Sequence, residues 1–462
     1  MKNFGNEHID VELLKRFDKP VPRYTSYPTA PEWGSLTPHE YLQQLETLKN
    51  AEAPLSLYFH VPFCKTMCLF CGCSVILNRR PENEERYVAY LLKEIDLVAN
   101  HLHEGQIVRQ LHFGGGTPTK LSIELLEKVM QKLRSRFQFP NSEISIEIDP
   151  RTVFEDKGLK LRQIHDLGFN RVSFGVQDVH ADVQEAVRRR QSYEMTLTTY
   201  KLAREIGFGG INIDLIYGLP LQTTEKFKDT IDKIVQMHPD RIALFSYAKI
   251  PWLKEHQKAI PDETLPSTEE KFKIYVQARQ QLIAGGYLGL GMDHFALKND
   301  PLAIAFCEGK LHRNFQGYTL NLAEDMLGFG VTSIGYCRDA YIQNIKELEP
   351  YYAALDRGEI PVQRGRVLSE SDRLRRWVIN KLMCQFELDK DQFGEIYGVP
   401  FARYFAAELP SIQAAIDDGL LVDAGNKLVA TPTGRLFIRN VASIFDWYLQ
   451  QKSGVGNFSK GI

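Results

Sequence analysis

Short apolar runs alternate with longer stretches of helical period through the first half of this 462-residue chain, and this alternation constrains the fold most strongly. The runs have the length of strands and occupy residues 55–62, 110–114, 143–148, 171–177, 211–217 and 241–248. Helix-period stretches such as 84–101, 123–137 and 193–206 lie between them. Because strands that alternate with helices build parallel β/α units, the sequence predicts an α/β fold that is barrel-like or doubly wound.

Three of these runs carry a polar face. Alternate residues of a strand point to opposite sides, and here one side is apolar while the other is polar. The polar sides carry Ser145, Glu147 and Asp149 in the third run, Ser173 and Gln177 in the fourth, and Asn212 and Asp214 in the fifth. A parallel sheet that is buried on both faces reads as nearly continuous apolar residues, so this pattern favours an interior that holds a ligand. Satisfied polar groups within an ordinary core are the alternative.

Four of the seven cysteines stand within ten residues, directly after the first apolar run, at Cys64, Cys68, Cys71 and Cys73. Three thiolates with the spacing CxxxCxxC can each hold one iron of a four-iron cluster. Such clusters usually take four cysteine ligands, so a cluster held by the first three would leave one iron open to a substrate or cofactor. Structural zinc is the alternative, but zinc sites usually pair two knuckles set well apart, and this chain has one such group.

Composition excludes several classes of protein. The formal net charge is −2, which does not favour general binding to nucleic acid. The charged N-terminal stretch does not resemble a signal peptide, and the sequence contains no run of 18 apolar residues, so we expect no membrane insertion. Thiolates available for iron fit a reducing compartment, and we expect a cytoplasmic protein.

The cysteine spacing, with Phe70 before the third cysteine, resembles the signature of radical S-adenosylmethionine enzymes. The glycines at 114–116 follow the second apolar run and resemble the GGE-like element that holds the methionyl amino group, with Gly116 in place of Glu as in one subfamily. Longer strings then narrow the resemblance: PRYTSYPTA, YFHVPFCKTMCLFCGC, FGGGTPT, EISIEIDPR, NRVSFGVQD, NIDLIYGLP, GMDHFA and LHRNFQGYT. They closely resemble the bacterial oxygen-independent coproporphyrinogen III oxidase family, and the match runs from near residue 10 to the C-terminus.

This resemblance implies a fold and a reaction. The expected fold is a partial (β/α)6 TIM-like radical S-adenosylmethionine barrel, followed by a C-terminal helical domain of winged-helix type. The expected enzyme is a radical S-adenosylmethionine oxidoreductase of porphyrin and haem biosynthesis. An adenosyl radical would abstract hydrogen from the β-carbon of a propionate, and loss of carbon dioxide and one electron would leave a vinyl group. Two such reactions would convert coproporphyrinogen III to protoporphyrinogen IX.

Site residues follow from the same resemblance. It implies that Cys64, Cys68 and Cys71 hold a 4Fe-4S cluster and that Cys73 is needed for activity without being a ligand. A first S-adenosylmethionine would contact Tyr58, Phe70, Gly115, Glu147 and Ile334, with Ile334 beside the adenine. A second would contact Gly116, Thr117, Gln177, Arg189, Asp214 and Ala248. We assign catalytic roles to Cys73, Glu147 and Tyr58.

Some of these positions have plainer alternatives. Tyr58 and Phe70 are equally compatible with core aromatics. Arg189 stands in a run of three arginines, and such a run on a helix is usually a solvated face. For the four carboxylates of the substrate we propose Arg23 and Arg313 as cationic partners. His294 is a candidate proton donor or acceptor, or a structural histidine.

We expect three parts: an N-terminal extension over the barrel mouth (1–50), the barrel and its extension (51–362), and a C-terminal helical domain (363–462). In the last part, helices are predicted at 369–386, 401–418 and 433–451, with a ribbon at 420–431. An electron donor such as flavodoxin or ferredoxin and a monomeric state are also expected. A haem chaperone, a haem-modifying radical enzyme and a DNA-binding regulator with a redox-sensing cluster are the competing functions.

Overall fold

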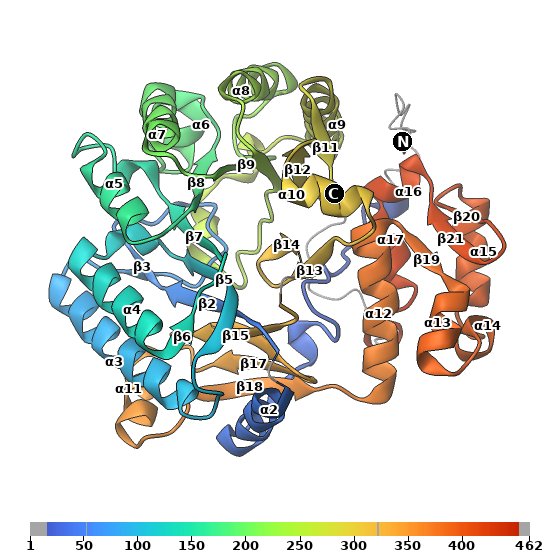
Figure 1. The fold of residues 1–462 in the computed structure, drawn as a ribbon. Helices are drawn as coiled ribbons and strands as arrows, with labels where there is room; N and C mark the ends of the chain where they lie inside the picture. The colour runs from blue at the N-terminus through green and yellow to red at the C-terminus, as the bar shows by residue number, and fades with distance from the viewer. Residues whose placement is uncertain (1–15, 52, 321–322, 452–462) are drawn as a thin grey trace.

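The computed structural model describes residues 16–51, 53–320 and 323–451, and it confirms the predicted α/β barrel architecture (Figure 1). The six predicted runs are neighbouring parallel strands, in the order β2 (Leu55–Val61), β5 (Gln106–Gly115), β7 (Glu143–Ile148), β8 (Arg171–Gln177), β9 (Gly210–Tyr217) and β10 (Arg241–Ser246). The helices that surround them are α3 (Pro81–Ala99), α4 (Ile123–Arg136), α5 (Leu159–Asp166), α6 (Ala181–Ala186), α7 (Tyr193–Ile206), α8 (Thr224–Met237) and α9 (Thr268–Ala284). The barrel is partial because the sheet continues into other strands at both ends.

Antiparallel strands extend the barrel sheet on both sides. Next to β2 lies β15 (Asp325–Phe329), which is still parallel to it, followed by β16 (Ile334–Cys337), β17 (Ala340–Asn344), β18 (Val362–Val367) and β1 (Gly34–Ser35). Beyond β10 lie β12 (His294–Leu297) and β11 (Tyr287–Gly289), and the short β6 (Phe137–Gln138) pairs with β5. The result is a mixed sheet.

Shorter elements connect these strands. They are η1 (Ala30–Glu32), α2 (Pro38–Ala51), β3 (Phe63–Cys64), β4 (Ile76–Leu77), η2 (Pro118–Lys120), η3 (Pro150–Thr152), η4 (Glu255–Ala259), η5 (Asp262–Thr264), α10 (Pro301–Cys307), β13 (His312–Asn314), β14 (Gly317–Thr319) and α11 (Leu348–Asp356). The hairpin β13–β14 is antiparallel and stands apart from the main sheet. No helix among the described residues is long and apolar enough to cross a membrane.

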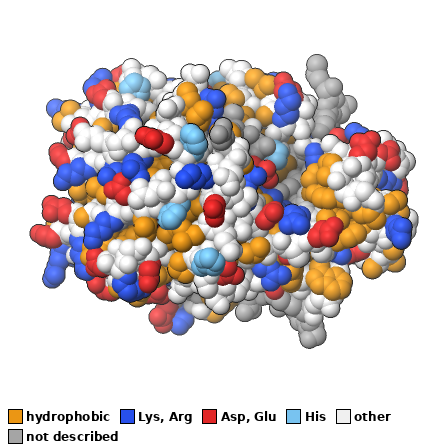
Figure 2. All heavy atoms as spheres, turned by 60° about the horizontal axis from the view of Figure 1, so that its bottom comes forward, with side chains coloured by type: hydrophobic (Ala, Val, Ile, Leu, Met, Phe, Trp, Pro, Cys, Tyr) orange, Lys and Arg blue, Asp and Glu red, His pale blue; other side chains and the backbone are white. Residues whose placement is uncertain are grey.

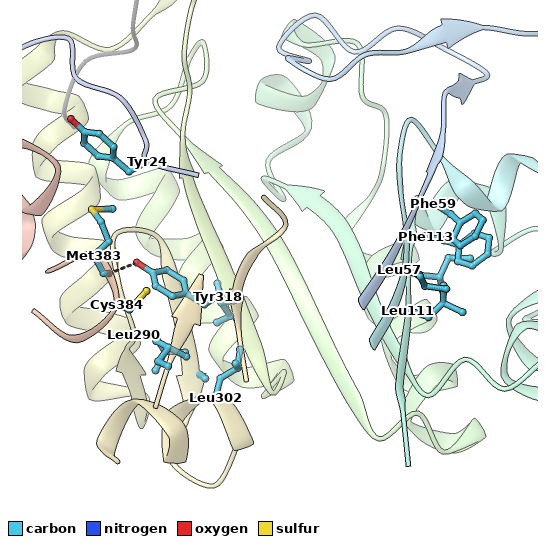
Figure 3. Packing of buried hydrophobic residues seen from close by; sticks show 14 of the residues in the cluster. Tyr24, Leu57, Phe59, Leu111, Phe113, Leu290, Leu302, Tyr318, Met383 and Cys384 are labelled. Atoms are coloured by element: carbon cyan, nitrogen blue, oxygen red, sulfur yellow. Dashed lines mark hydrogen bonds between the residues drawn. The ribbon is translucent and has the colours of Figure 1, made fainter. Parts of the chain in front are cut away.

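The alternation of side chains along the strands positions both the core and the site. Ile144, Ile146 and Ile148 of β7 are buried, whereas the residues between them are partly exposed on the inner side of the barrel. Burial of each such side chain contributes about 1.5–3 kcal/mol. Figure 3 shows one part of this core, where Phe59 of β2 packs on Phe113 of β5 with ring centroids 5.0 Å apart. The predicted two-faced strands are confirmed.

The C-terminal domain consists of helices around a small sheet. Its sheet has the order β19 (Glu387–Asp389), β21 (Lys427–Ala430) and β20 (Leu421–Asp423). Its helices are α12 (Glu370–Gln385), α13 (Lys390–Tyr397), α14 (Phe401–Tyr404), α15 (Leu409–Asp417), α16 (Pro432–Leu436), α17 (Ile438–Ser443) and α18 (Trp447–Gln450). Helix α12 begins with a capping box in which Ser369 and Asp372 exchange hydrogen bonds.

Two predicted helices of this domain are broken. The helix predicted at 401–418 is interrupted between α14 and α15, where Pro410 lacks an amide hydrogen and disfavours a continuous helix. The helix predicted at 433–451 is divided into α16, α17 and α18. Its last break precedes Asp446, which has an extended backbone and caps α18 by accepting a hydrogen bond from the Leu449 amide. Hydrophobic periodicity alone did not locate any of these interruptions.

The N-terminal segment connects the barrel to the C-terminal domain. Tyr24 donates a hydrogen bond to Asp446 over 3.0 Å, and the hydroxyl of Tyr27 accepts one from the Trp447 amide over 3.1 Å. Arg439, in the same domain, donates to the carbonyls of Val21 and Pro22. On the face seen in Figure 2, positive and negative side chains are interspersed. That face therefore carries no extended field of one sign.

Candidate functional site

A cavity of about 870 Å³ lies inside the barrel, and its wall carries most of the predicted site residues. These are Cys64, Cys68, Phe70, Cys71, Cys73, Gly115, Gly116, Thr117, Glu147, Gln177, Arg189, Asp214 and Ala248. The cysteine loop follows β2, and the polar residues come from β7, β8 and β9. Parallel strands end at one rim, so segments from 64 to 248 in the sequence meet around one space. A volume of this size is typical of a small-molecule or cofactor site.

The cysteine loop offers free thiols in a setting that fits an iron-sulfur cluster. Cys64, Cys68 and Cys71 are not in disulfides, and all three line the cavity. Arg189 and Arg151 direct guanidinium groups to the Cys68 sulfur over 3.6 and 3.8 Å. Cationic donors of this kind stabilise thiolates and the negative charge of a cluster. Among the described residues, no group of three His, Cys, Asp or Glu side chains could hold a single metal ion.

The carbonyl groups of the cysteine loop are held by one distant segment. Lys254 donates to the carbonyl of Cys73 over 2.7 Å. The imidazole of His256 donates to the carbonyl of Cys71 over 2.8 Å, and the amide of Gln257 donates to Phe70 over 2.9 Å. Three successive hydrogen bonds therefore fix the half of the loop that carries the third and fourth cysteines. The sequence analysis missed this clamp, because Lys254, His256 and Gln257 form no recognisable motif.

Glu147 occupies the inner face of β7 and is bound on two sides. One carboxylate oxygen lies 3.3 Å from the Nε2 of His112, and the other accepts the Gly115 amide over 3.1 Å. Burial raises the pKa of Glu147. The hydrogen bonds from His112 and Gly115 and the charge of His112 lower this pKa by a larger amount, so the net shift is downward. Glu147 is therefore an ionised acceptor at neutral pH, suited to an amino or hydroxyl group.

The glycine segment 114–116 allows the cysteine loop and β5 to approach closely. Gly115 has a φ of +112°, which side chains rarely tolerate, and a Cβ there would lie 2.5 Å from the ring of His60. A Cβ at Gly116 would lie 2.7 Å from the carbonyl oxygen of Pro62. Close packing therefore requires the third glycine, at the position where a GGE-like element carries glutamate.

Tyr58 contacts His60, which in turn holds the backbone of the cysteine loop at Ser74. Its hydroxyl lies 3.0 Å from the Nδ1 of His60, whose Nε2 lies 2.9 Å from the carbonyl of Ser74. Since a carbonyl only accepts, the Nε2 carries the proton and the Tyr58 hydroxyl donates to Nδ1. Burial lowers the pKa of His60, which keeps the imidazole neutral. Tyr58 thus contacts the loop indirectly and is not among the residues that line the cavity as described.

Asp214 and Gln177 stand on neighbouring strands. The carboxylate of Asp214 accepts from Asn212 over 2.7 Å and from Ser173 over 3.1 Å. Burial, followed by the negative charge of Glu147, raises the pKa of Asp214 to about 6. Gln177 ends β8 with a φ of +72°, at a register shift, and its side chain lies on the cavity wall. Strained backbone of this kind is often found at ligand sites.

The structure distinguishes Arg189 from its two neighbours. The arginine run follows α6 and is not helical, contrary to the solvated helical face considered above. Arg188 and Arg190 are exposed, and Arg190 pairs with Glu185, whereas Arg189 is buried. Arg189 lies 3.5 Å from Asp149 and donates to the Gly175 carbonyl over 2.5 Å. Arg190 also borders the cavity, but of the three arginines Arg189 is the one that is buried there.

Other predicted residues lie elsewhere. Ile334 begins β16 and packs beside Trp33, outside the described wall of the cavity. Arg23 pairs with Asp293, and Arg313 donates to the carbonyls of Arg23 and Tyr24, so these cations hold the N-terminal segment. His294 lines the cavity and pairs with Asp293 over 2.5 Å. The substrate-binding roles given to Arg23 and Arg313 stay predictions.

Comparisons with known proteins agree with this geometry. Residues 58–234 match the model of the radical SAM superfamily, where SAM stands for S-adenosylmethionine, and residues 368–437 match that of the HemN C-terminal domain. A protein of Synechocystis named oxygen-independent coproporphyrinogen III oxidase is 44% identical over 99% of each chain. A protein of Escherichia coli with the same name is 43% identical over 98% of each chain.

A solved structure extends the similarity to three dimensions. It is described as coproporphyrinogen III oxidase (HemN) from Escherichia coli, a radical SAM enzyme. It superposes with a TM-score of 0.90 at 42% identity, covering 95% of this chain and 99% of that one. The similarity therefore spans both the barrel and the C-terminal domain.

Proposed function

This chain belongs to the oxygen-independent coproporphyrinogen III oxidases of the radical SAM superfamily, and from this premise we propose that it oxidises coproporphyrinogen III to protoporphyrinogen IX. One observation supports the proposal most directly. Three free thiols and a set of ionisable groups from separate strands line a single cavity at the carboxyl ends of the barrel strands. Radical chemistry needs such an enclosed space, because the enclosure keeps water and competing reactants away from the radical.

In this proposal Cys64, Cys68 and Cys71 hold a 4Fe-4S cluster. When bound, the cluster supplies the electron that cleaves S-adenosylmethionine to methionine and an adenosyl radical. Arg151 and Arg189 offset the negative charge beside Cys68. With both groups bound, hydrogen would be removed from the β-carbon of a propionate, the carboxylate would leave as carbon dioxide, and one electron would pass to an acceptor. The carbon that carried the carboxylate and the β-carbon become a vinyl group.

The remaining site residues bind and orient. Glu147, ionised and fixed by the Gly115 amide, accepts from the first S-adenosylmethionine, and Phe70 contacts the same molecule. Tyr58 acts through His60 on the cysteine loop. Cys73 acts without ligating iron, and its carbonyl is held by Lys254.

A second S-adenosylmethionine would bind in the same cavity, against Gly116, Thr117, Gln177, Arg189, Asp214 and Ala248. These residues line the same cavity, and Arg189 and Asp214 supply the opposite charges that a methionyl carboxylate and ribose hydroxyls or an amino group require. Equilibrium dialysis of reconstituted protein with labelled S-adenosylmethionine should give two molecules per chain. A stoichiometry of one in wild-type protein would contradict the second site.

We also retain the finer predictions on organisation and partners. The protein would be a cytoplasmic monomer that receives electrons from a flavodoxin or ferredoxin. Its three parts would be the N-terminal extension (1–50), the barrel with its extension (51–362) and the C-terminal helical domain (363–462). The contacts of Arg23 and Tyr24 with the barrel and the C-terminal domain support a covering role for the N-terminal extension. Residues 1–15 lie outside the described residues.

The direct test is an anaerobic assay of cluster-reconstituted protein with coproporphyrinogen III, S-adenosylmethionine, a low-potential reductant and cell extract as acceptor source. Products are oxidised and separated by chromatography. Protoporphyrin that forms with the wild type and not with Cys64→Ala supports the proposal. No conversion, despite cleavage of S-adenosylmethionine, would refute it and favour a haem-modifying enzyme or a haem chaperone, which haem binding would then distinguish.

A further inference from the structure

A second cavity of about 340 Å³ lies beside the first, between the β13–β14 hairpin and α12. We call it the side chamber. It shares Asn314 and Thr319 with the wall of the main cavity. Four cationic side chains line it, Arg313, Arg373, Arg376 and Lys381, together with His312 and the carboxylates Glu324 and Asp339. No residue of the cysteine loop lines the side chamber.

Positive charge in the main cavity is already committed to carboxylates of the protein. Its cations include Arg151 with Asp149, Arg171 and Arg241 with Glu143 and Asp300, Arg189 with Asp149, Arg190 with Glu185, and Lys120 with Glu84. Lys65, on the cysteine loop, is the other cation of that wall. Arg151 and Arg189 share the one carboxylate of Asp149, and we assign Arg189 to S-adenosylmethionine. Little positive charge in the main cavity is therefore left for a substrate with four carboxylates.

Lys381 in the side chamber is free of such a partner. It is half-buried on α12, its ammonium lies 5.3 Å from the ring centroid of Trp377, and it forms no ion pair within the described part of the chain. Burial lowers the pKa of Lys381, although the charges of Cys384, Glu387 and Asp389 oppose the shift. Lys381 also lines a separate cavity with Glu387 and Asp389, but it forms a direct ion pair with neither. A half-buried ammonium without a direct ion pair attracts an anion that comes within hydrogen-bond distance.

Arg376 stands next to it in a fixed orientation. Its Nε and Nη1 donate to the hydroxyls of Tyr341 and Tyr336 over 3.0 and 2.9 Å, and the guanidinium stacks 4.0 Å from the Tyr336 ring centroid. The nearest carboxylate, Glu324, is 69% exposed and 3.8 Å away, so it neutralises Arg376 only weakly. The guanidinium of Arg376 is therefore held in one orientation, and most of its positive charge is available to a bound anion.

His312 lies close enough to Arg376 and Lys381 for their positive charges to affect its pKa. Crowding by neighbouring residues, followed by the charges of Arg376 and Lys381, lowers the pKa of His312, although its side chain is exposed. The histidine is therefore neutral at pH 7 and is able to donate one hydrogen bond. Together, a neutral donor and two cations around one space provide the donors that a carboxylate requires.

We propose that the side chamber is a carboxylate-binding subsite, in which Lys381 and Arg376 hold a propionate of the tetrapyrrole substrate. This inference rests on the proposed function. Because the radical forms near the cysteine loop, which does not reach the side chamber, the bound group is a propionate that the reaction leaves intact. The subsite would position the ring so that a reacting propionate lies at the opposite end of the main cavity.

The test measures binding of coproporphyrin III, the oxidised and unreactive form of the substrate, to wild-type protein, Lys381→Gln and Lys381→Arg by fluorescence. Loss of one charged hydrogen bond should raise the Kd of Lys381→Gln about tenfold, and Lys381→Arg should restore most of the affinity. Lys273→Gln is the matched control, because Lys273 pairs with Glu269 on the outer helix α9. Thermal melting checks that each variant folds.

Turnover separates this inference from the proposed function. With coproporphyrinogen III, Lys381→Gln should raise KM about tenfold, whereas Lys273→Gln should keep the KM of the wild type. Wild-type turnover with an unchanged Kd and KM in Lys381→Gln would overturn the subsite alone. Absence of binding and turnover in the wild type would instead overturn the proposed function, and with it the subsite.

Discussion

Replacement of Gln257 by leucine should loosen the cysteine loop. Gln257 is fully buried on η4, donates to the carbonyls of Phe70 and Ala248 over 2.9 and 3.3 Å, and accepts from the Ile250 amide over 2.6 Å. Leucine removes all three bonds and leaves three backbone groups unsatisfied. The bond to Phe70 holds the loop directly, and the other two fix the segment that also carries Lys254 and His256. At about 1 kcal/mol for each hydrogen bond, the clamp as a whole should therefore be weakened by about 3 kcal/mol. That corresponds to about a hundredfold increase in the open population.

The measurable consequence is faster loss of the cluster. Reconstituted protein is mixed anaerobically with an iron chelator, and the decay of cluster absorbance is followed. If chelation proceeds through loop opening, Gln257→Leu should lose iron about a hundredfold faster than the wild type. Gln413→Leu, at an exposed residue paired with Asp417, is the matched control. A rate for Gln257→Leu within threefold of the control would refute the clamp.

Three further predictions concern the cavity wall. Arg189→Lys should raise the KM for S-adenosylmethionine about tenfold, measured as 5'-deoxyadenosine release, whereas the exposed Arg190→Lys should match the wild type. Burial and the charge of Glu147 raise the pKa of Asp214 to about 6, so affinity for S-adenosylmethionine should fall below pH 6 in the wild type and stay flat in Asp214→Asn. An aspartate in the unfolded chain has a pKa of about 3.9, so ionisation of Asp214 lowers the stability of the fold as the pH rises from that value to 6. Asp214→Asn avoids this cost and should have a higher melting temperature than the wild type above pH 6. Gly116→Ala should lower iron content, since its Cβ would meet a carbonyl oxygen at 2.7 Å.

Patterns along the strands were sufficient to predict an α/β fold that is barrel-like or doubly wound, with one polar interior, and the family resemblance favoured the barrel. A strand exposes every second side chain to the same side, so Glu147, Gln177 and Asp214 could be assigned to one interior from spacing alone. The cysteines were equally visible, because their ligand spacing is local. The two interrupted C-terminal helices were not visible, since a proline effect and a side-chain cap act against a periodicity that continues past them.

What the sequence could not supply is the pairing of groups that are distant along the chain. The clamp joins Gln257 to Phe70 through a backbone carbonyl, which has no sequence signature. The same limit applies to charge: a cation appears available in a sequence whether or not a carboxylate neutralises it. Arg23 was proposed for the substrate, yet it pairs with Asp293, whereas Lys381 on α12 was passed over and has no such partner within the described part of the chain. The distribution of unpaired charge, which only the folded chain defines, therefore directs the search for the substrate's carboxylates to the C-terminal domain.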